Sequence, residues 1–547
     1  MKDRRARRPD KRLRFFLFIC LASLVQCEAA PVPDPPDPPI TDPDPRMIAW
    51  APGIPGGIPA YPTAINVRNA PYGAKGDGVT DDTGAIQRAI QACPARSAVY
   101  LPAGTYRLTS RISIDLKSIV LRGDGPDKTF LKSEVDAGDL ISITGGAGPV
   151  GSTAISSGYS KGSTSLTVGS ASGLKTGDYI LVSQTNDPSV CEDMRPYQTR
   201  AVAQTVRITA VSGNRLTVNR PLYYTYGASF SPLAEKYLLI ENAGVEDLHI
   251  ERMISGGGAN IFLGYAANCW IKNVESRNAG NSHVTVRQGY ANVVRSSYFH
   301  HGHAYAGGAG YGVFLLGRCT DNLIEDNILY HLRHGVTLEW GGCGNVIAYN
   351  YATRFFDENY PDTPWLMQSI HTHGGHPYMN LIEGNICPNI VFDNALGSSR
   401  HNTAFRNHAE RYGEGVQANL NAVEVQRNNL YENIIGNVLC RPGDTGAYEV
   451  GSSAPGVYKL GCNQSDCGSP DPRAKETLLR HGNFDYVTGT TVWDPGIESR
   501  ALPNSRYLTS KPSFFGALPW PMIGPDLDPM VGDLPAKMRF EGRPVPR

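Results

Sequence analysis

One short pattern returns through the middle of this 547-residue chain: an asparagine, four other residues and a second asparagine. The first asparagines of successive copies are 24, 30, 23, 35, 22 and 26 residues apart. This count includes one degenerate copy, Asn292-VVRS-Ser297. A period of about 20–50 residues is typical of folds that stack one repeat on the next. The sequence therefore predicts a stack of coils. The complete copies begin at Asn268, Asn322, Asn345, Asn380, Asn402 and Asn428.

The segments before these asparagines predict what each coil contains. They alternate apolar and polar residues and lack the 3.6-residue period of a helix, as in His283-VTVRQ, Tyr311-GVFLL, Gly335-VTLEW and Asn389-IVFDN. Short strands in coils of about 23 residues, with Gly and Asn at the corners, are typical of a parallel β-helix. We predict an all-β fold in which the asparagines form a structural ladder, because stacked amides can hydrogen-bond from coil to coil.

The region from Ala64 to Thr129 precedes the repeats. It contains Tyr72-GAKGDGVTDDTGAIQRAI, in which Asp81 or Asp82 is expected to cap a helix with one apolar stripe, and then Val99-YLPAGTY. These runs resemble the N-terminal signature of the pectin-lyase-like superfamily, which includes pectate lyases, polygalacturonases and related glycosidases, alginate epimerases and phage tailspikes. The resemblance implies a right-handed, single-stranded parallel β-helix with an N-terminal helix cap. The catalytic signatures of the polygalacturonases, classical pectate lyases and alginate epimerases do not occur, so no catalytic residue is transferred.

Composition divides the chain into six predicted segments. A basic stretch, a short apolar run and small residues near Cys27 predict a signal peptide, whose apolar run is too short to span a bilayer. Pro-Asp-Pro repeats predict a flexible spacer, and alternating strands after Thr153 predict an inserted β-subdomain. The segments are a signal peptide at 1–30, a proline-rich linker at 31–62, a cap with the first coils at 63–152, the β-subdomain at 153–226, coils with an active-site face at 227–440, and C-terminal coils with a cap at 441–547.

Charge and cysteine content bound the partners and the compartment. The chain carries 51 Lys and Arg against 51 Asp and Glu, which excludes a strong general attraction to nucleic acid or anionic membranes. We expect a monomer without a membrane span. Its expected partner is a polysaccharide, and polymers that contain uronic acids are among the candidates. Export implies a secreted or periplasmic location, or a cell-surface lipoprotein if Cys27 is lipidated. It also permits disulfides, which we predict for Cys319 with Cys343 and for Cys462 with Cys467.

Histidine and arginine are concentrated in the coils. Eleven of the thirteen histidines lie between His283 and His408, a span without lysine, and nine arginines lie between Arg287 and Arg427. Imidazole titrates near neutral pH, and guanidinium forms hydrogen bonds with carboxylates and sugar hydroxyls. The pattern indicates a carbohydrate-handling face, although some of these histidines can instead cap turns.

Alternation along the strands predicts which side chains leave the core. In Gly335-VTLEW the valine and the leucine face inward, so Glu339 faces outward, and the same rule turns His371, His373 and Asp393 outward. Neighbouring rungs lie about 4.8 Å apart, so the four side chains should converge on one exposed patch. We predict these four residues to be catalytic, because two carboxylates with imidazoles suit acid–base cleavage of a glycosidic bond.

Further side chains are predicted to bind substrate around this patch. One belongs to a long insertion, Phe355-FDENYPDTPWL, immediately before the histidine strand, and loops extruded from a rigid scaffold commonly carry function. The predicted substrate-binding residues are Arg287, Arg333, His334, Arg400, His401 and Trp365.

Three kinds of function fit these residues. The first is cleavage of glycosidic bonds, either by a hydrolase that uses Glu339 and Asp393 or by a lyase that uses a histidine or arginine base on a uronate. A lyase must neutralise the uronate with arginine or with a cation such as Ca²⁺, and no cofactor is otherwise expected. The second is a carbohydrate-binding or adhesin β-helix without catalysis. The third is a metal centre of His371, His373 and Glu339. We favour the first and assign no metal ligand.

Overall fold

The computed structural model describes residues 46–546 except 189–191, 193–194, 196–197, 363, 453 and 464–466. The predicted signal peptide with Cys27, and residues 31–45 of the predicted linker, lie outside these ranges. Among the described residues, no helix has both the length and the apolar composition needed to cross a lipid bilayer.

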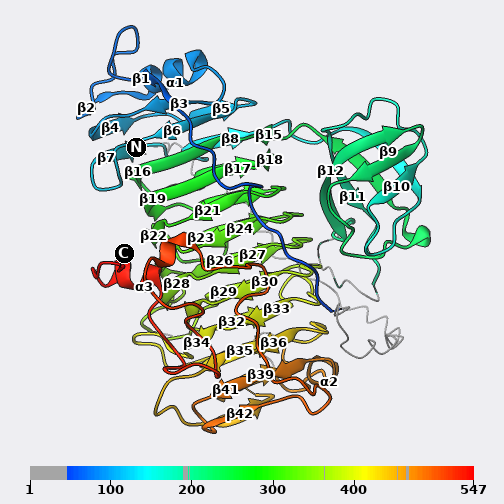
Figure 1. Cartoon of the computed structure of the whole chain (residues 1–547). Coiled ribbons are helices and arrows are strands. Elements are labelled where there is room, and N and C mark those ends of the chain that lie inside the picture. The colour runs from blue at the N-terminus through cyan, green and yellow to red at the C-terminus, as the bar shows by residue number, and fades with distance from the viewer. Residues whose placement is uncertain are drawn as a thin grey trace, which may run out of the picture. The chain divides into compact units, whose positions relative to one another are not determined.

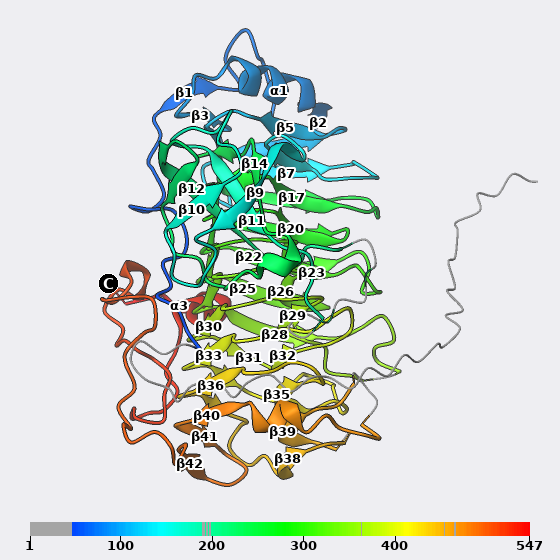
Figure 2. The same ribbon diagram turned by 90° about the vertical axis from the view of Figure 1, so that its right-hand side faces the viewer.

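The repeats form coils that stack into a parallel β-helix, as the sequence predicted (Figures 1 and 2). One sheet, called sheet B here, contains eleven strands among the described residues, and the other, sheet A, contains twenty-three. Most coils give one strand to sheet B and two shorter strands to sheet A. The strands of sheet B are β5 (Ile112–Asp115), β8 (Ile141–Thr144), β17 (Ala259–Gly264), β20 (Ser282–Arg287), β23 (Tyr311–Leu316), β26 (His334–Glu339), β29 (Ile370–His373), β32 (Ile390–Phe392), β35 (Asn421–Val425), β38 (Ala447–Val450) and β39 (Gly456–Leu460).

Sheet A forms the remaining walls of the coils, and all its pairings except β41 with β42 are parallel. Its strands are β1 (Thr63–Asn66), β2 (Asp77–Asp81), β3 (Ser97–Tyr100), β4 (Gly104–Leu108), β6 (Ile119–Arg122), β7 (Thr129–Ser133), β16 (Gly244–Arg252), β19 (Trp270–Ala279), β21 (Val293–Arg295), β22 (Tyr298–Gly302), β24 (Leu323–Glu325), β25 (Ile328–Leu332), β27 (Val346–Ala348), β28 (Tyr351–Phe355), β30 (Leu381–Glu383), β31 (Ile386–Cys387), β33 (Thr403–Phe405), β34 (His408–Ala409), β36 (Asn433–Ile435), β37 (Val438–Leu439), β40 (Leu479–His481), β41 (Asn483–Asp485) and β42 (Thr490–Val492). A separate short pair consists of β15 (Ile240–Glu241) and β18 (Ala266–Ala267).

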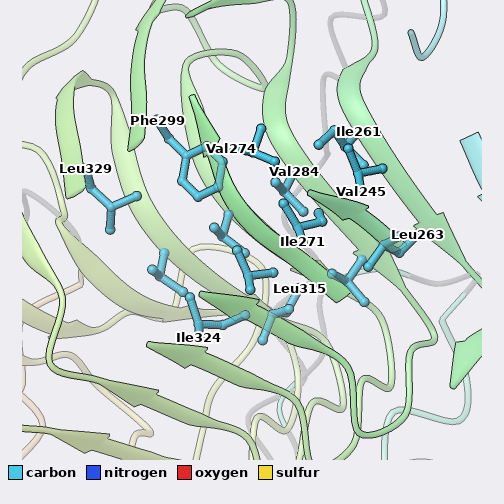
Figure 3. Close-up of a cluster of buried hydrophobic side chains, with 14 of the residues drawn as sticks. Val245, Ile261, Leu263, Ile271, Val274, Val284, Phe299, Leu315, Ile324 and Leu329 are labelled. Carbon is cyan, nitrogen blue, oxygen red and sulfur yellow. The ribbon is translucent and has the colours of Figure 1, made fainter. Parts of the chain in front are cut away.

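An apolar interior, to which successive coils contribute, holds the stack together. In sheet B, Val336, Ile370 and Ile390 align in register and are fully buried. Sheet A supplies residues such as Ile324 and Leu329 to the same cluster (Figure 3). Each buried aliphatic side chain contributes roughly 1.5–3 kcal/mol. Because side chains alternate along a strand, the residues between these positions point away from the interior.

Two ladders of asparagine run along corners of the coils. In the first, the side-chain amide of Asn322 donates to Oδ1 of Asn345 at 2.8 Å, and Asn345 donates to Asn380 at 2.9 Å. These buried amides are satisfied from coil to coil, which confirms the predicted structural role. The second ladder passes through Asn327, Asn350, Asn385, Asn407, Asn437 and Asn483.

The first and the last copies of the pattern are out of register with the ladders. In the first copy the ladder position falls on Cys269 rather than Asn268, since the main-chain N–H of Cys269 donates to Oδ1 of Asn292 at 2.8 Å. The first ladder continues at Glu432 rather than at Asn428, since the main-chain N–H of Asn402 donates to Oε2 of Glu432 at 2.7 Å. The second ladder continues at Asn437, five residues further on. A glutamate therefore occupies a position that asparagine holds in neighbouring coils.

The inserted β-subdomain is a closed antiparallel barrel. Its strands extend from Pro149 to Tyr237, beyond the predicted 153–226 at both ends. Glu192, on the connection from β11 to β12, contacts the coils, where the main-chain N–H of Ser398 donates to the carbonyl of Glu192 at 2.9 Å. The barrel strands are β9 (Pro149–Ser157), β10 (Ser165–Val168), β11 (Tyr179–Ser183), β12 (Ala203–Ser212), β13 (Arg215–Val218) and β14 (Leu233–Tyr237).

Helices are few and short in the described part of the chain. The predicted helix near the N-terminus is α1 (Thr83–Ala92), and its apolar stripe packs into the interior of the first coils. Asp82 holds the N-cap position, but its carboxylate accepts the main-chain N–H groups of Lys75 and Gly76, so it fixes the preceding loop. The other helices are α2 (Arg473–Glu476), α3 (Pro535–Phe540) and the 3₁₀ turns at Ala228–Phe230 and Ser513–Phe515.

Both terminal segments pack along the outward face of sheet A. Trp50, in the predicted flexible linker, is buried and donates its indole N–H to the carbonyl of Met379 at 2.7 Å, so residues 46–62 belong to the fold. Near the last coils, Ala474, Tyr486 and Val487 of the C-terminal segment pack against the apolar interior, and the segment then runs back along the stack to α3, which contacts β25 (Figure 1). The face that both segments help to cover is an apolar column made of Trp270, Val293, Leu323, Val346 and Leu381.

Of the two predicted disulfides, Cys462–Cys467 forms and Cys319–Cys343 is wrong. Cys343 aligns in register with Thr320, one position after Cys319. Neighbouring residues along an extended chain point to opposite faces. Cys319 therefore enters the interior of the coils, whereas Cys343 packs outside it.

Candidate active site

A cavity of about 870 Å³ opens on the outward face of sheet B. Its lining includes residues from β23, β26, β29, β35 and β39, so it follows the stack over five steps of about 4.8 Å, or roughly 24 Å. All four predicted catalytic residues line this cavity. Of the predicted substrate-binding residues, Arg333, His334 and Trp365 line it as well.

Strand register places the acid–base groups in one column. Glu339 lies opposite His373 in the parallel pairing of β26 with β29. On the next coil, the two carboxylate oxygens of Asp393 lie 2.9 and 3.1 Å from Nδ1 of His373. His371 occupies the neighbouring outward column, with Nε2 at 3.8 Å from Oδ2 of Asp393. The structure thus brings all four side chains together.

The predicted exposure of this patch is wrong. Glu339, His371 and Asp393 are only 2%, 1% and 5% exposed. Their side chains leave the core as alternation requires, but Arg195 of the barrel connection and the loop residues Trp365 and Leu396 line the same cavity around them. Alternation of a strand distinguishes inside from outside of the coil and carries no information about what packs over the outside.

Arg195 is a site residue that sequence reasoning missed. It lies on the connection between β11 and β12, lines the cavity, and forms a hydrogen-bonded ion pair with Glu339. The two residues are 144 positions apart, and the barrel contains no repeat that would align it with a rung. The inserted barrel therefore contributes directly to the site.

Burial and pairing separate the proton affinities of the two carboxyls. Burial raises the pKa of Glu339 above its ordinary value, although the charge of Arg195 opposes the shift. Burial would also raise the pKa of Asp393, but the charge and hydrogen bond of His373 outweigh it and hold that pKa below its ordinary value. In His373 burial is outweighed by Asp393, so its pKa is raised. The pair is an imidazolium beside a carboxylate.

His371 differs from its neighbour His373. Burial, reinforced by the charge of His334, holds the pKa of His371 well below its ordinary range, so its imidazole is neutral. The rings of His371 and His334 lie 4.6 Å apart, and Nδ1 of His371 is buried without a hydrogen-bond partner among the described residues. One ligand atom each from His371, His373 and Asp393 lies within 4.8 Å of the others, so this trio could hold a metal ion.

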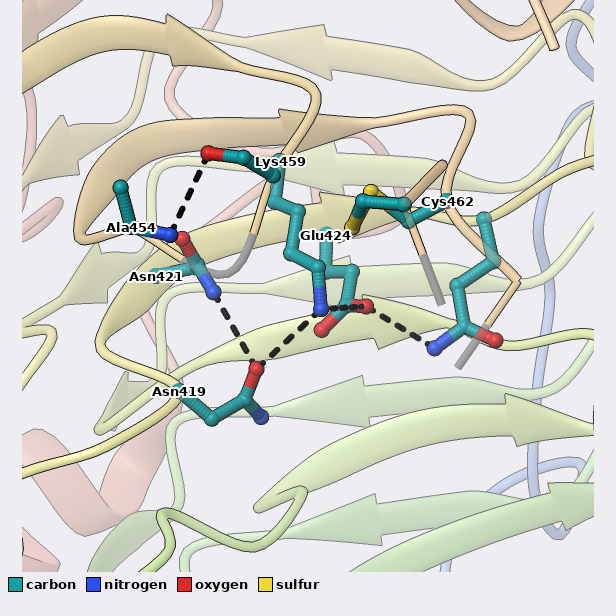
Figure 4. Close-up of a disulfide and its surroundings, with 9 residues drawn as sticks. Asn419, Asn421, Glu424, Ala454, Lys459 and Cys462 are labelled. Carbon is teal, nitrogen blue, oxygen red and sulfur yellow. Dashed lines mark hydrogen bonds and ion pairs between the residues drawn. A yellow bond between two sulfur atoms is a disulfide. The ribbon is translucent and has the colours of Figure 1, made fainter. Parts of the chain in front are cut away.

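A second ion pair lies at the far end of the cavity and was not predicted. Nζ of Lys459 is 2.9 Å from the carboxylate of Glu424, and both side chains are buried (Figure 4). Gln426 donates to the same carboxylate at 2.9 Å. These residues follow Asp393 on β35 and β39, and Lys459 also approaches Asn419 at 3.4 Å. The end beyond Asp393 is therefore polar, whereas Phe314 and Tyr311 line the opposite end.

Three predicted substrate-binding residues do not line the cavity. Arg287 is exposed and belongs to the column of Glu339, two rungs away through Leu316. Arg400 and His401 lie at the corner between the sheets, where both contact the ring of Tyr431. Their predicted position beside the catalytic patch is wrong, because the chain has already turned away from sheet B at that point.

Parts of the chain resemble known sequences. The family described as Rhamnogalacturonase A/epimerase, pectate lyase-like, matches residues 64–156, and the family described as Right handed beta helix region matches residues 234–358. The chain is a pectin-lyase-like, right-handed β-helix protein. This β-helix protein is also 50% identical over 48 residues to an exo-poly-α-D-galacturonosidase of Dickeya chrysanthemi, a match that covers 9% of this chain and 8% of the relative.

One solved structure shares this fold at a TM-score above 0.5. The tailspike protein gp49 from Pseudomonas phage LKA1 has a TM-score of 0.53 and 16% identity, with 70% of this chain and 65% of the tailspike covered. PfbA, a surface adhesin of Streptococcus pneumoniae, has a TM-score of 0.42 and 11% identity, with 77% and 85% covered. The chain spans less than two thirds of the length of the galacturonosidase and of the tailspike.

Proposed function

We propose that this protein hydrolyses glycosidic bonds of a polysaccharide in the cavity on sheet B. The observation that carries the proposal is the column in which Glu339 and Asp393 stand two rungs apart with His373 between them. Two rungs correspond to about 9.6 Å. Inverting glycosidases separate their two carboxyls by about 6.5–9.5 Å, to leave room for a water, whereas retaining enzymes hold them at about 5–5.5 Å. The strand spacing lies at the upper limit of the inverting range and well beyond the retaining one, so it favours inversion.

The environments of the two carboxyls suit different roles. Glu339, whose pKa is raised, is the general acid that protonates the leaving oxygen, and Asp393 is the ionised general base that activates water. The water supplies a hydroxyl to the anomeric carbon, and its proton passes to Asp393. His373 holds the Asp393 carboxylate in place from one side.

Other features of the cavity fit a saccharide chain. Trp365, Tyr311 and Phe314 offer aromatic faces, on which sugar rings can stack. Arg333 and the polar end near Lys459 offer donors for hydroxyls. The matching family and the Dickeya relative carry names of carbohydrate-active enzymes, which supports the same class of substrate for this chain.

A lyase is the second candidate, and one observation favours it. His371 is neutral, buried and directed toward the cavity, and a base of this kind could remove the C5 proton of a uronate while Arg333 faces its carboxylate. A lyase product contains an unsaturated uronate that absorbs ultraviolet light, whereas a hydrolase product does not.

The test is incubation of the protein with a panel of neutral and uronic-acid polysaccharides, with reducing ends and ultraviolet absorbance recorded together. Reducing ends without absorbance are expected, and absorbance would instead identify a lyase. Glu339→Gln and Asp393→Asn should each lower the rate about 10²–10⁴-fold. Glu414→Gln is the matched control, because Glu414 is exposed. If no polysaccharide yields product, the protein is a binding β-helix and the proposal fails.

A further inference from the structure

His371, His373 and Asp393 combine three donors that transition metals prefer. His373 Nδ1 and His371 Nε2 lie 2.9 and 3.8 Å from the same oxygen, Oδ2 of Asp393, and one ligand atom from each residue falls within 4.8 Å of the others. In a tetrahedral zinc site with bonds of about 2.0–2.1 Å, neighbouring ligand atoms are about 3.3 Å apart. The two observed separations, 2.9 and 3.8 Å, lie below and above that value.

The state of His371 is an independent observation. Its side chain is 1% exposed, and it makes no hydrogen bond among the described residues. A buried imidazole without a partner costs stability, since the lost hydration is not replaced. Its Nδ1 is the buried atom without a partner, and its Nε2 lies 3.8 Å from Oδ2 of Asp393, too far for a hydrogen bond. A metal ion bound to Nε2 would give the ring the partner that it otherwise lacks.

Strand geometry holds the three ligands in place. His371 and His373 are two positions apart on β29 and therefore emerge on the same side of the sheet. Asp393 follows β32 directly on the adjacent coil, where the main-chain N–H of Ala395 donates to its Oδ1 at 3.1 Å and leaves Oδ2 toward the histidines. A fourth coordination position would open into the cavity, toward water or a sugar hydroxyl.

We propose that His371, His373 and Asp393 bind one divalent first-row transition-metal ion such as Zn²⁺, and that this ion inhibits hydrolysis at the same site. Binding forms one bond to the metal from each residue, breaks the hydrogen bond between His373 and Asp393, and releases the proton of His373 to solvent. Imidazole nitrogens favour such ions over Mg²⁺ and Ca²⁺, which prefer oxygen ligands. The inhibitory part rests on the proposed function, because it requires Asp393 to be the general base.

Calorimetric titration of the full protein, freed of metal with a chelator, tests the binding part without any substrate. One Zn²⁺ per chain is expected, MgCl₂ should give no heat, and Co²⁺ should produce visible absorption bands of a nitrogen-containing site. His371→Ala should weaken Zn²⁺ binding at least 100-fold, since loss of partners outside the ligand shell alone costs about 10–100-fold. His303→Ala is the matched control, because this half-buried imidazole lies on another loop.

The fold of each variant is checked by circular dichroism, and the Co²⁺ spectrum of the unaltered protein provides a readout that no variant affects. Absence of Zn²⁺ binding to the unaltered protein, or binding by a folded His371→Ala variant within about threefold of it, would overturn the site. For the inhibitory part, hydrolysis should persist in chelator and fall when Zn²⁺ is added. If activity requires Zn²⁺, the inhibitory part of the proposal is wrong, but the proposed bond cleavage stands. If no activity is found at all, the proposed function is refuted, whereas the metal titration still tests the binding part.

Discussion

Glu432 provides a quantitative test of how the ladder is built. It is fully buried where neighbouring coils carry asparagine, and it accepts hydrogen bonds from the hydroxyl of Ser399 at 2.8 Å and from the main-chain and side-chain amides of Asn402 at 2.7 and 3.2 Å. Burial raises its pKa to about 8 from 4.5. A carboxyl that is neutral at physiological pH resembles an amide in shape and in hydrogen bonding, which is why it fits the ladder.

The sign of the effect on stability follows from proton binding. Because the folded state holds the proton more tightly than the unfolded state, unfolding releases it once the pH exceeds about 4.5. The free energy of unfolding should therefore fall as the pH rises from about 4.5 to about 8, and stay level above that. One pKa unit corresponds to about 1.4 kcal/mol, so the total loss is at most about 5 kcal/mol.

Glu432→Gln should remove this dependence. The amide keeps the neutral shape but cannot ionise, so the variant should match the unaltered protein near pH 4.5 and exceed it by a few kcal/mol at pH 9. Urea unfolding followed by circular dichroism at pH 4.5, 7 and 9 measures the difference. Glu414→Gln, at an exposed position, should leave the pH dependence unchanged. Equal pH dependence in the Glu432→Gln variant and the unaltered protein would refute the reasoning.

Two further predictions concern the cavity. Arg195→Ala should raise the pKa of Glu339 further, so the alkaline limb of kcat/KM should move to higher pH, and Arg195→Lys should restore its position. An unmoved limb in a pH–rate profile of Arg195→Ala would show that Arg195 does not act on the acid. Lys459→Met leaves the buried Glu424 without its counter-ion and should lower the free energy of unfolding, measured in urea, by about 3–5 kcal/mol. Adding Glu424→Met should recover most of that loss. A double variant as unstable as Lys459→Met alone would contradict this account.

The coil architecture could be predicted because it depends on short-range periodicity in the sequence. Asparagine spacing gave the stack, and two-residue alternation correctly turned Glu339 and His371 out of the interior. The pattern failed where another residue type served the same purpose: Glu432 takes a ladder position, so the Asn428 copy was placed four residues early. Cys319 was misplaced by one position, which is enough to reverse the face of a side chain.

What periodicity cannot predict is contact between distant segments. The column of Glu339 and Asp393 shares its cavity with loop residues and with Arg195, which reaches Glu339 across 144 positions. Likewise, nothing in the proline-rich composition of the predicted linker shows that Trp50 has a hydrogen-bonding partner at Met379. Such contacts depend on shape complementarity in three dimensions, which produces no periodic pattern in the sequence.

The two outward faces of the stack explain why the site lies where it does. On sheet A the outward column is apolar through Trp270, Val293 and Leu323, and the two termini help to cover it, so its burial adds stability. On sheet B, the column of Glu339 and Asp393 carries charged groups into an equally buried position, where each ionised side chain loses hydration. An apolar column there would avoid this loss of hydration. The proposed hydrolysis, which needs titratable groups beside a cavity, would account for this cost. The explanation would be wrong if replacing the column of Glu339 and Asp393 with apolar residues left cleavage intact.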